Sequence, residues 1–120
     1  MAESGAGDGI RIFLLFEAAT FVVASLIHSG ALISGYEHQQ ARIAEGVIAI
    51  VLLIGAVITW IRPAWTRLAS LVAQGFALLG TLVGVFTIIV GVGPRTLPDI
   101  GYHLAIVVVL VWGLIFTRRL

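Results

Sequence analysis

The three histidines and six acidic residues of this chain are the side chains whose types allow metal binding or proton transfer. His28 and Glu45 bound one polar stretch, residues 28–45, and His103 follows much later in the chain. Two histidines and one carboxylate form a ligand set suited to Zn, Fe, Mn or Cu. No stretch is a catalytic motif on its own, so we expect any chemistry to depend on residues that the fold brings together.

A metal site is the first hypothesis for these residues. We expect His28, Glu45 and His103 to ligate the ion, with His38 and Asp99 supporting them as spare ligands or hydrogen-bond partners. A metal ion with an open coordination position would activate water or oxygen, whereas a closed site would only be structural. The sequence therefore leaves open whether the protein is an enzyme.

A haem site is a variant of this hypothesis. One b-type haem would have His28 and His103 as axial ligands, with Tyr102 beside it and Arg95 near the propionates. Two other interpretations remain open. Either an organic ligand such as a quinone binds among the same residues, or these polar groups only hydrogen-bond one another and hold the helix ends together.

Glu17 suggests a separate chemistry, because a lone carboxylate inside an apolar helix is costly unless it has a partner or a function. Ser70 has the same expected depth as Glu17, so Glu17 would be satisfied there or by Gln74. In chain length, helix number and the string FEAAT around Glu17, the sequence resembles the small multidrug resistance transporters. That resemblance implies a proton exchanged at Glu17 for a cationic drug, in an antiparallel dimer.

Composition indicates a membrane protein. Of the 120 residues, 60% are hydrophobic and only 11% are charged, too few for the surface of a soluble domain. Four apolar stretches reach about 20 residues, the length that crosses a bilayer. The net charge of +1 argues against a nucleic-acid partner, and the absence of cysteine excludes disulfides and thiolate sites.

We predict an all-α protein, an integral membrane antiparallel four-helix bundle. Residues 1–9 are small and acidic, so we expect a disordered N-terminal tail before a single domain of residues 10–120. Gly35 is expected to end the first helix, and Thr96 with Asp99 to form a capping box for the fourth. The expected helices are 10–34, 37–60, 64–90 and 97–117.

Helical rise places the expected ligands at one level. His28, Glu45 and His103 each lie six or eight residues from an expected helix end, about 9 to 12 Å along the helix axis. Asp99 shares a face with His103, so Asp99 is expected to accept a hydrogen bond from one of its nitrogens. The interior stripe of the third helix is expected to be Ser70, Gln74, Ala77, Thr81 and Gly84.

The arginines predict the orientation. Five are expected at one end of the bundle and two, Arg42 and Arg95, at the other, so the positive-inside rule places both termini in the cytoplasm. The expected partners are the lipid bilayer and either a second copy of the chain or a larger membrane complex. Gly80 and Gly84 allow a close helix neighbour, within one bundle or between two copies.

In length, topology and its polar first hairpin, the whole chain is similar to small bacterial four-helix membrane proteins of the DoxX-like kind. The resemblance implies the bacterial inner membrane and an association with redox-linked membrane complexes. It supports a further alternative, a non-catalytic helper subunit whose polar face binds a partner.

Overall fold

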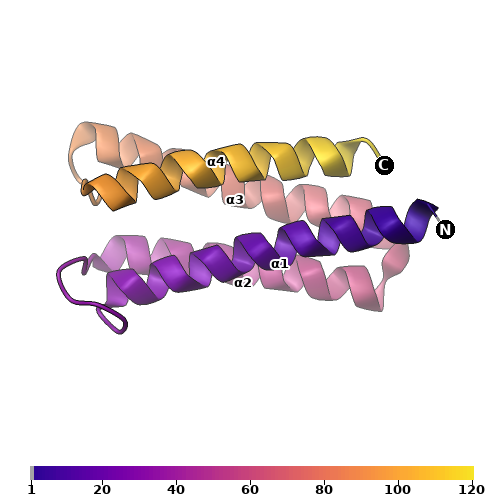
Figure 1. Cartoon of the computed structure of the whole chain (residues 1–120), viewed down its shortest axis with the longest axis horizontal. Coiled ribbons are helices and arrows are strands. Elements are labelled where there is room, and N and C mark those ends of the chain that lie inside the picture. Colours follow the sequence, from indigo (N-terminus) through magenta and orange to yellow (C-terminus); the bar gives the residue numbers. More distant parts are fainter. Residues whose placement is uncertain (1) are drawn as a thin grey trace.

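The computed structural model describes residues 2–120 of the chain, which form four long α-helices and a short 3₁₀ turn. Figure 1 shows the helices side by side along one axis. Both chain ends lie at one end of the molecule, the termini end, and residues 30–38 and 91–96 lie at the other, the loop end. The elements are α1 (Ala2–Ser29), α2 (Gln39–Ile61), η1 (Pro63–Trp65), α3 (Thr66–Val90) and α4 (Leu97–Arg118).

The start of α1 differs from the prediction of a disordered tail. The helix begins at Ala2, so residues 2–9 belong to it, while Met1 is outside the described residues. Asp8 and Arg11 form an ion pair of 3.1 Å across one helical turn, a contact that stabilises helix over coil. Asp8, one of the acidic residues that suggested disorder, therefore helps to stabilise the helix.

The end of α1 also differs, because the helix ends at Ser29 and not at residue 34. Gly30 adopts a positive φ of 81°, and the amide of Ala31 bonds back to the carbonyl of Leu26 at 3.2 Å. This is the usual glycine-based end of a helix. His28 consequently lies in the last turn of α1 and not six residues inside the helix.

The ends of α3 and α4 agree closely with the prediction. α3 ends at Val90 because Gly91 adopts a φ of 91°, which terminates the helix in the left-handed region. The predicted capping box of α4 is confirmed, since the Thr96 side chain accepts from the Asp99 amide and the Asp99 side chain accepts from the Thr96 amide. This cap fixes where Asp99 lies.

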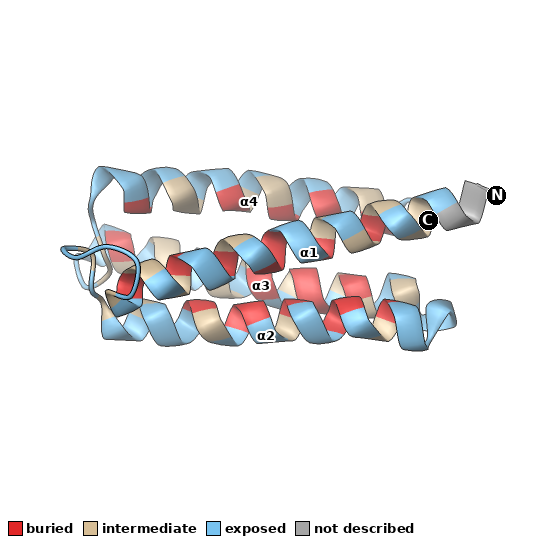
Figure 2. Ribbon diagram, turned by 60° about the horizontal axis from the view of Figure 1, so that its bottom comes forward, coloured by how far each residue is buried: buried red, intermediate tan, exposed pale blue. Residues whose placement is uncertain are grey.

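Each helix buries one stripe of residues against the others, as Figure 2 shows. The predicted interior stripe of α3 is confirmed for Ser70, Gln74, Ala77 and Thr81, which are all buried. The outward faces are apolar, and on α4 Leu104 is 61% and Trp112 63% exposed. In the described residues, four helical segments are long and apolar enough to cross a membrane: Gly5–Ser29, Gln39–Ile61, Pro63–Val90 and Leu97–Arg118.

Gly80 and Gly84 allow α3 to approach its neighbours inside this one chain. A Cβ on Gly80 would lie 2.9 Å from a side-chain carbon of Ile48 on α2. A Cβ on Gly84 would lie 3.0 Å from Nε2 of His103 on α4. Both glycines therefore serve packing within the bundle.

Candidate functional site

His28 lies between two carboxylates at the loop end. Its Nδ1 is 2.6 Å from Oε1 of Glu45 on α2, close but not aligned as a hydrogen bond, and its Nε2 is 2.8 Å from Oδ1 of Asp99 on α4. All three side chains are buried, and we call them the acid–histidine cluster. If all three groups are ionised, one positive and two negative charges leave a net negative charge. Burying such a charge in an apolar bundle is costly unless something compensates it.

Each nitrogen of His28 has a carboxylate oxygen within 2.8 Å. Neither nitrogen is free to ligate a metal ion or a haem iron unless one carboxylate moves away. The structure thus brings together His28 and Glu45, as expected, but places Asp99 where His103 was expected. Within residues 2–120, no group of three or more His, Asp or Glu side chains is arranged to hold a metal ion.

Asp99 has two roles because its two oxygens have different partners. Oδ1 faces His28, while Oδ2 accepts from the backbone amide of Thr96 at 3.2 Å and from its hydroxyl. The cap at the start of α4 therefore holds the carboxylate in position against α1. Sequence reasoning identified the cap but not the contact with His28.

His103 bonds to the backbone of Asp99 and not to its carboxylate, which His28 and Thr96 already occupy. Its Nδ1 lies 2.7 Å from the Asp99 carbonyl oxygen, one turn earlier on α4. A carbonyl can only accept, so Nδ1 carries the hydrogen and Nε2 of the neutral imidazole keeps a free lone pair. His103 can therefore accept a hydrogen bond or ligate a cation through Nε2.

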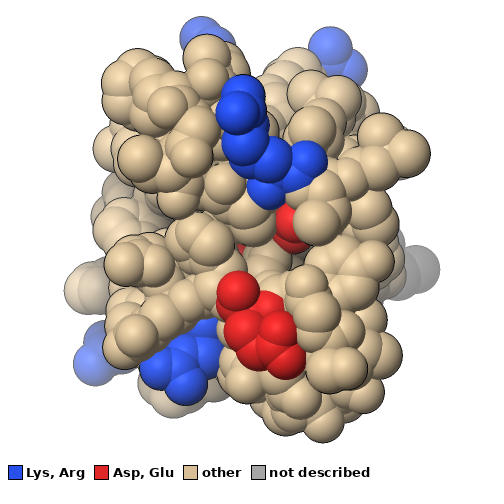
Figure 3. Space-filling model, turned by 90° about the vertical axis from the view of Figure 1, so that its left-hand side faces the viewer, with Lys and Arg blue, Asp and Glu red and all other residues tan. Residues whose placement is uncertain are grey.

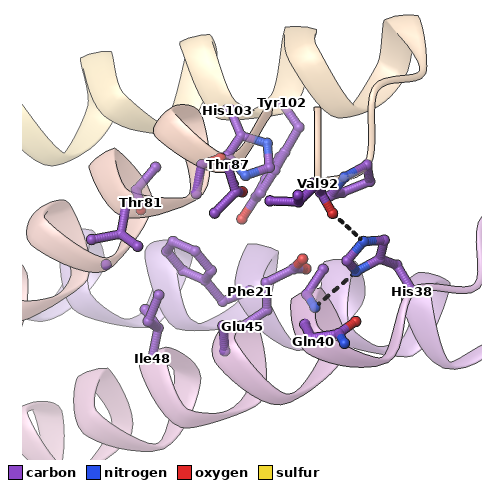
Figure 4. Close-up of a pocket in the computed structure, with 17 residues that line it drawn as sticks. Phe21, His38, Gln40, Glu45, Ile48, Thr81, Thr87, Val92, Tyr102 and His103 are labelled. Atoms are coloured by element: carbon purple, nitrogen blue, oxygen red, sulfur yellow. Dashed lines mark hydrogen bonds between the residues drawn. The ribbon is translucent and has the colours of Figure 1, made fainter. Parts of the chain in front are cut away.

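A cavity of about 430 Å³, the loop-end cavity, lies beside the cluster between α2, α3 and α4. Its apolar lining includes Phe21 and Ile48. Figure 4 shows Glu45 reaching into this space from α2, opposite Tyr102 and His103 from α4. Two hydroxyl side chains of α3, Thr81 and Thr87, also line it.

The polar groups deep in the loop-end cavity are acceptors without a spare hydrogen. Thr81 and Thr87 each donate their hydroxyl to a carbonyl of their own helix at 2.7 Å, and the Tyr102 hydroxyl donates to Thr20 at 3.2 Å. Oε2 of Glu45 is buried and has no hydrogen-bond partner among the described residues. The cavity therefore offers lone pairs and a carboxylate to whatever binds there.

His38 lies at the mouth of this cavity and caps α2. Its Nδ1 accepts from the Ala41 amide and its Nε2 donates to the Val92 carbonyl, each at 3.2 Å, as the dashed lines in Figure 4 show. Both nitrogens of His38 are engaged in these hydrogen bonds. The structure therefore does not place His38 in the expected role of a spare or supporting metal ligand. Gln40, an exposed amide, also lies at the mouth. Figure 3 views this end and shows a hollow between basic and acidic side chains, with acidic atoms inside it.

Two arginines at the loop end stay outside the site. Arg95 is exposed and does not line the loop-end cavity, so its expected role at haem propionates stays a prediction. Arg42 is also exposed, and the ion pairs of the described residues do not include one between Arg42 and Glu45. Neither arginine therefore pairs with a carboxyl group of the acid–histidine cluster.

A second space, the α1/α4 groove, has a volume of about 550 Å³. Its lining is mostly apolar, with Phe16 and Val23 among its residues, and His28 and Asp99 lie at its polar end. Tyr102 lines both this groove and the loop-end cavity. The tyrosine ring therefore stands between the two spaces.

Glu17 is fully buried in the middle of the bundle and meets Gln74, as expected. One terminal atom of the Gln74 amide lies 3.0 and 3.2 Å from the two Glu17 oxygens. Ser70 takes part only through its backbone carbonyl, 3.3 Å from the other terminal atom, because its buried hydroxyl has no partner among the described residues. Glu17 therefore lies in a site separate from the acid–histidine cluster.

Sequence reasoning missed two threonines of these sites, Thr87 and Thr117. Thr87 continues the predicted interior stripe of α3 three residues beyond Gly84, so the same helical spacing would have found it. Thr117 lies at the expected end of the fourth helix, where a polar residue is typical of the membrane interface. Nothing in the sequence pattern therefore predicted its contact with Gln74.

Comparisons of the chain with protein-family models, with curated proteins and with solved structures found no match. We therefore infer its function from the chemistry of its side chains.

Proposed function

We propose that the chain is an integral membrane protein, an antiparallel four-helix bundle in the inner membrane of a bacterium with both termini in the cytoplasm. The four apolar helices and their exposed apolar faces support insertion into a bilayer. The excess of arginines expected at the termini end supports the orientation. In this arrangement the loop-end cavity opens on the outer side of the membrane.

Within that membrane protein, we propose that the loop-end cavity binds a small organic cation, such as a protonated amine. The observation that carries the proposal is Glu45, a buried carboxyl group with no hydrogen-bond partner for either oxygen among the described residues, in a cavity whose hydroxyl groups have no spare hydrogen. A ligand that brings positive charge and N–H donors complements these groups. It would also offset the net negative charge of the acid–histidine cluster.

The shape and walls of the cavity fit such a ligand. A volume of about 430 Å³ lies in the usual range of small-molecule pockets. Phe21 and Tyr102 supply aromatic surface, which attracts ammonium groups through their π-faces. Binding from the outer side would serve as the recognition step of a carrier or a sensor in the membrane.

A metal ion is the second candidate, and the free Nε2 of His103 is the observation that favours it. Glu45 and His103 would be the protein ligands, with threonine hydroxyls and water completing the shell. His28 would not ligate the ion but would hold Glu45 in place. A haem iron is less favoured, because each nitrogen of His28 lies within 2.8 Å of a carboxylate oxygen that would have to move.

Calorimetry on the purified protein in lipid nanodiscs tests both candidates, with 2-phenylethylammonium and Zn²⁺ as separate probes. Loss of a charge that pairs with a ligand in a buried site typically costs about 2 kcal/mol or more, roughly thirty-fold in Kd. We therefore expect Glu45→Gln to weaken amine binding by at least that factor. Glu37→Gln is the matched control, because Glu37 is an exposed acid at the same end and does not line the cavity.

The outcomes separate the candidates. Amine binding that is lost in Glu45→Gln and kept in Glu37→Gln supports the organic cation. Binding of Zn²⁺ alone, lost in both Glu45→Gln and His103→Gln, supports the metal ion. If Glu45→Gln binds the amine as tightly as the parent protein does, and also binds Zn²⁺ as tightly, the proposal is overturned.

A further inference from the structure

Glu17 has no charged partner, although it is the most deeply buried acid of the described chain, with 0% of its surface exposed. It contacts the amide of Gln74 on α3, and that amide contacts the hydroxyl of Thr117 on α4 at 3.0 Å. Gly113 provides the space, because a Cβ there would overlap the Gln74 amide and lie 3.0 Å from Oε2 of Glu17. We call Glu17, Gln74 and Thr117 the carboxyl–amide cluster.

A protonated Glu17 gives one complete hydrogen-bond arrangement. Its O–H donates to the Gln74 amide oxygen at 3.0 Å, and the amide nitrogen donates to the Thr117 hydroxyl at 3.0 Å and to the Ser70 carbonyl at 3.3 Å. The Thr117 hydroxyl donates in turn to the Gly113 carbonyl at 2.7 Å. Every polar hydrogen of the cluster then has an acceptor.

An ionised Glu17 requires the opposite orientation of the amide, because a carboxylate and an amide oxygen cannot face each other without a hydrogen between them. After a half-turn of the amide, its nitrogen donates to the Glu17 oxygens at 3.0 and 3.2 Å, and its oxygen accepts from Thr117 at 3.0 Å. Thr117 then gives up its bond to the Gly113 carbonyl, and the Ser70 carbonyl loses the Gln74 nitrogen and faces the amide oxygen instead. The same heavy-atom positions thus hydrogen-bond the Glu17 carboxyl group in both charge states, and the ionised state costs two carbonyl contacts.

We infer that the carboxyl–amide cluster is a proton-binding site in which protonation of Glu17 is linked to a half-turn of the Gln74 amide. The proton comes from water and returns to it, and no other reactant is needed. Each state leaves the carboxyl group hydrogen-bonded, which a buried acid requires. The half-turn passes the change at α1 through α3 to the last turn of α4.

The surroundings of Glu17 make this linkage local. Gln74 faces it from α3 and Gly113 from α4, and neither residue has a titratable group. On its own helix the nearest titratable side chain toward the termini end is Arg11, which bonds to Asp8 and to Thr59 of α2. The cation proposed for the loop-end cavity is not involved, so this inference does not depend on that function.

Nuclear magnetic resonance of the full chain in nanodiscs, labelled with ¹⁵N in glutamine side-chain amides and ¹³C in glutamate carboxyl groups, tests the inference. As pH is varied, we expect the Gln74 amide and the Glu17 carboxyl carbon to shift together, with one midpoint. The amides of Gln39 and Gln40, outside the cluster, are internal controls. The Gln74 shift should vanish in Glu17→Gln and persist in Glu45→Gln.

The unmodified protein alone can decide the question if Glu17→Gln does not fold. A Gln74 amide that stays constant while the Glu17 carboxyl carbon titrates would overturn the linkage. A Glu17 carboxyl carbon that does not titrate at any pH at which the protein remains folded would overturn the proton site itself. A Gln74 shift that survives in folded Glu17→Gln would assign the change to another group.

Discussion

At the scale of single residues, one imidazole determines how two buried acids are accommodated at the loop end. Each nitrogen of His28 faces a different carboxylate, one from α2 and one from α4. Removing the ring would leave two acidic side chains buried beside each other without the imidazole that both contact. Breaking a buried ion pair by deleting one partner typically costs about 3 to 5 kcal/mol.

We therefore expect His28→Leu to lower the free energy of unfolding by about 3 to 5 kcal/mol. Unfolding in mixed detergent micelles, followed by circular dichroism as the denaturing detergent increases, measures this change. Adding Glu45→Gln to His28→Leu should recover part of the loss, because one unpaired charge is removed. A double variant no more stable than the single one would show that Glu45 carries no buried charge.

At the scale of elements, small residues set the distance between helices. Gly113 faces Gln74 across the contact between α3 and α4, whereas a Cβ on Gly75 would meet nothing within 4 Å. Both glycines thus lie inside long apolar helices, but only Gly113 packs closely against another helix. This contrast separates close packing from the general effect of glycine on a helix.

We expect Gly113→Ala to destabilise the bundle by about 1 to 3 kcal/mol, the usual effect of overpacking a filled interior. Gly75→Ala is the control and should be neutral or stabilising by up to about 1 kcal/mol, because alanine is the better helix former. The same detergent titration measures both. Equal stability of the two variants would mean that the contact at Gly113 yields without cost.

The elements also show where sequence reasoning succeeded and where it could not. The start of α4 was predicted because Thr96 and Asp99 have the residue types and the spacing of a capping box. The end of α1 was not, because Gly30 and Gly35 can both adopt the positive φ that stops a helix, and each does so in the structure. That choice shifted the expected depth of His28.

The candidate site was also predicted only in part. His28 and Glu45 were identified because ionisable residues in apolar helices face the interior, and they do meet. On α4 the contact of His28 is Asp99, which was expected only as a supporting residue, and not His103. Helix rotation and hydrogen-bond competition at Asp99 decide this contact, and no spacing in the sequence encodes either.

At the scale of the whole molecule, the proposed orientation in a membrane rests on the distribution of arginines. The loop end carries Arg42 and Arg95, and the remaining five arginines are assigned to the termini end. Because the chain has no cysteine, a single introduced thiol reports its own position without background. Ser34 is exposed in the loop after α1, and Leu120 is exposed at the C-terminus.

We expect Ser34→Cys to react with a membrane-impermeant maleimide added to intact cells, and Leu120→Cys to react only after the cells are opened. This result follows from the proposed cytoplasmic position of both termini. The reverse labelling pattern would invert the orientation and place the loop-end cavity toward the cytoplasm. Labelling of both thiols in intact cells would indicate two orientations.

Tyr102 belongs to the walls of both the loop-end cavity and the α1/α4 groove, and its hydroxyl is tied to Thr20 across the gap between α4 and α1. Breaking that one hydrogen bond and rotating the ring would join the loop-end cavity to the α1/α4 groove. An amphiphilic amine could then keep its hydrocarbon tail among the acyl chains while its charged head reached Glu45. Access through the side of the bundle would depend on this single aromatic ring.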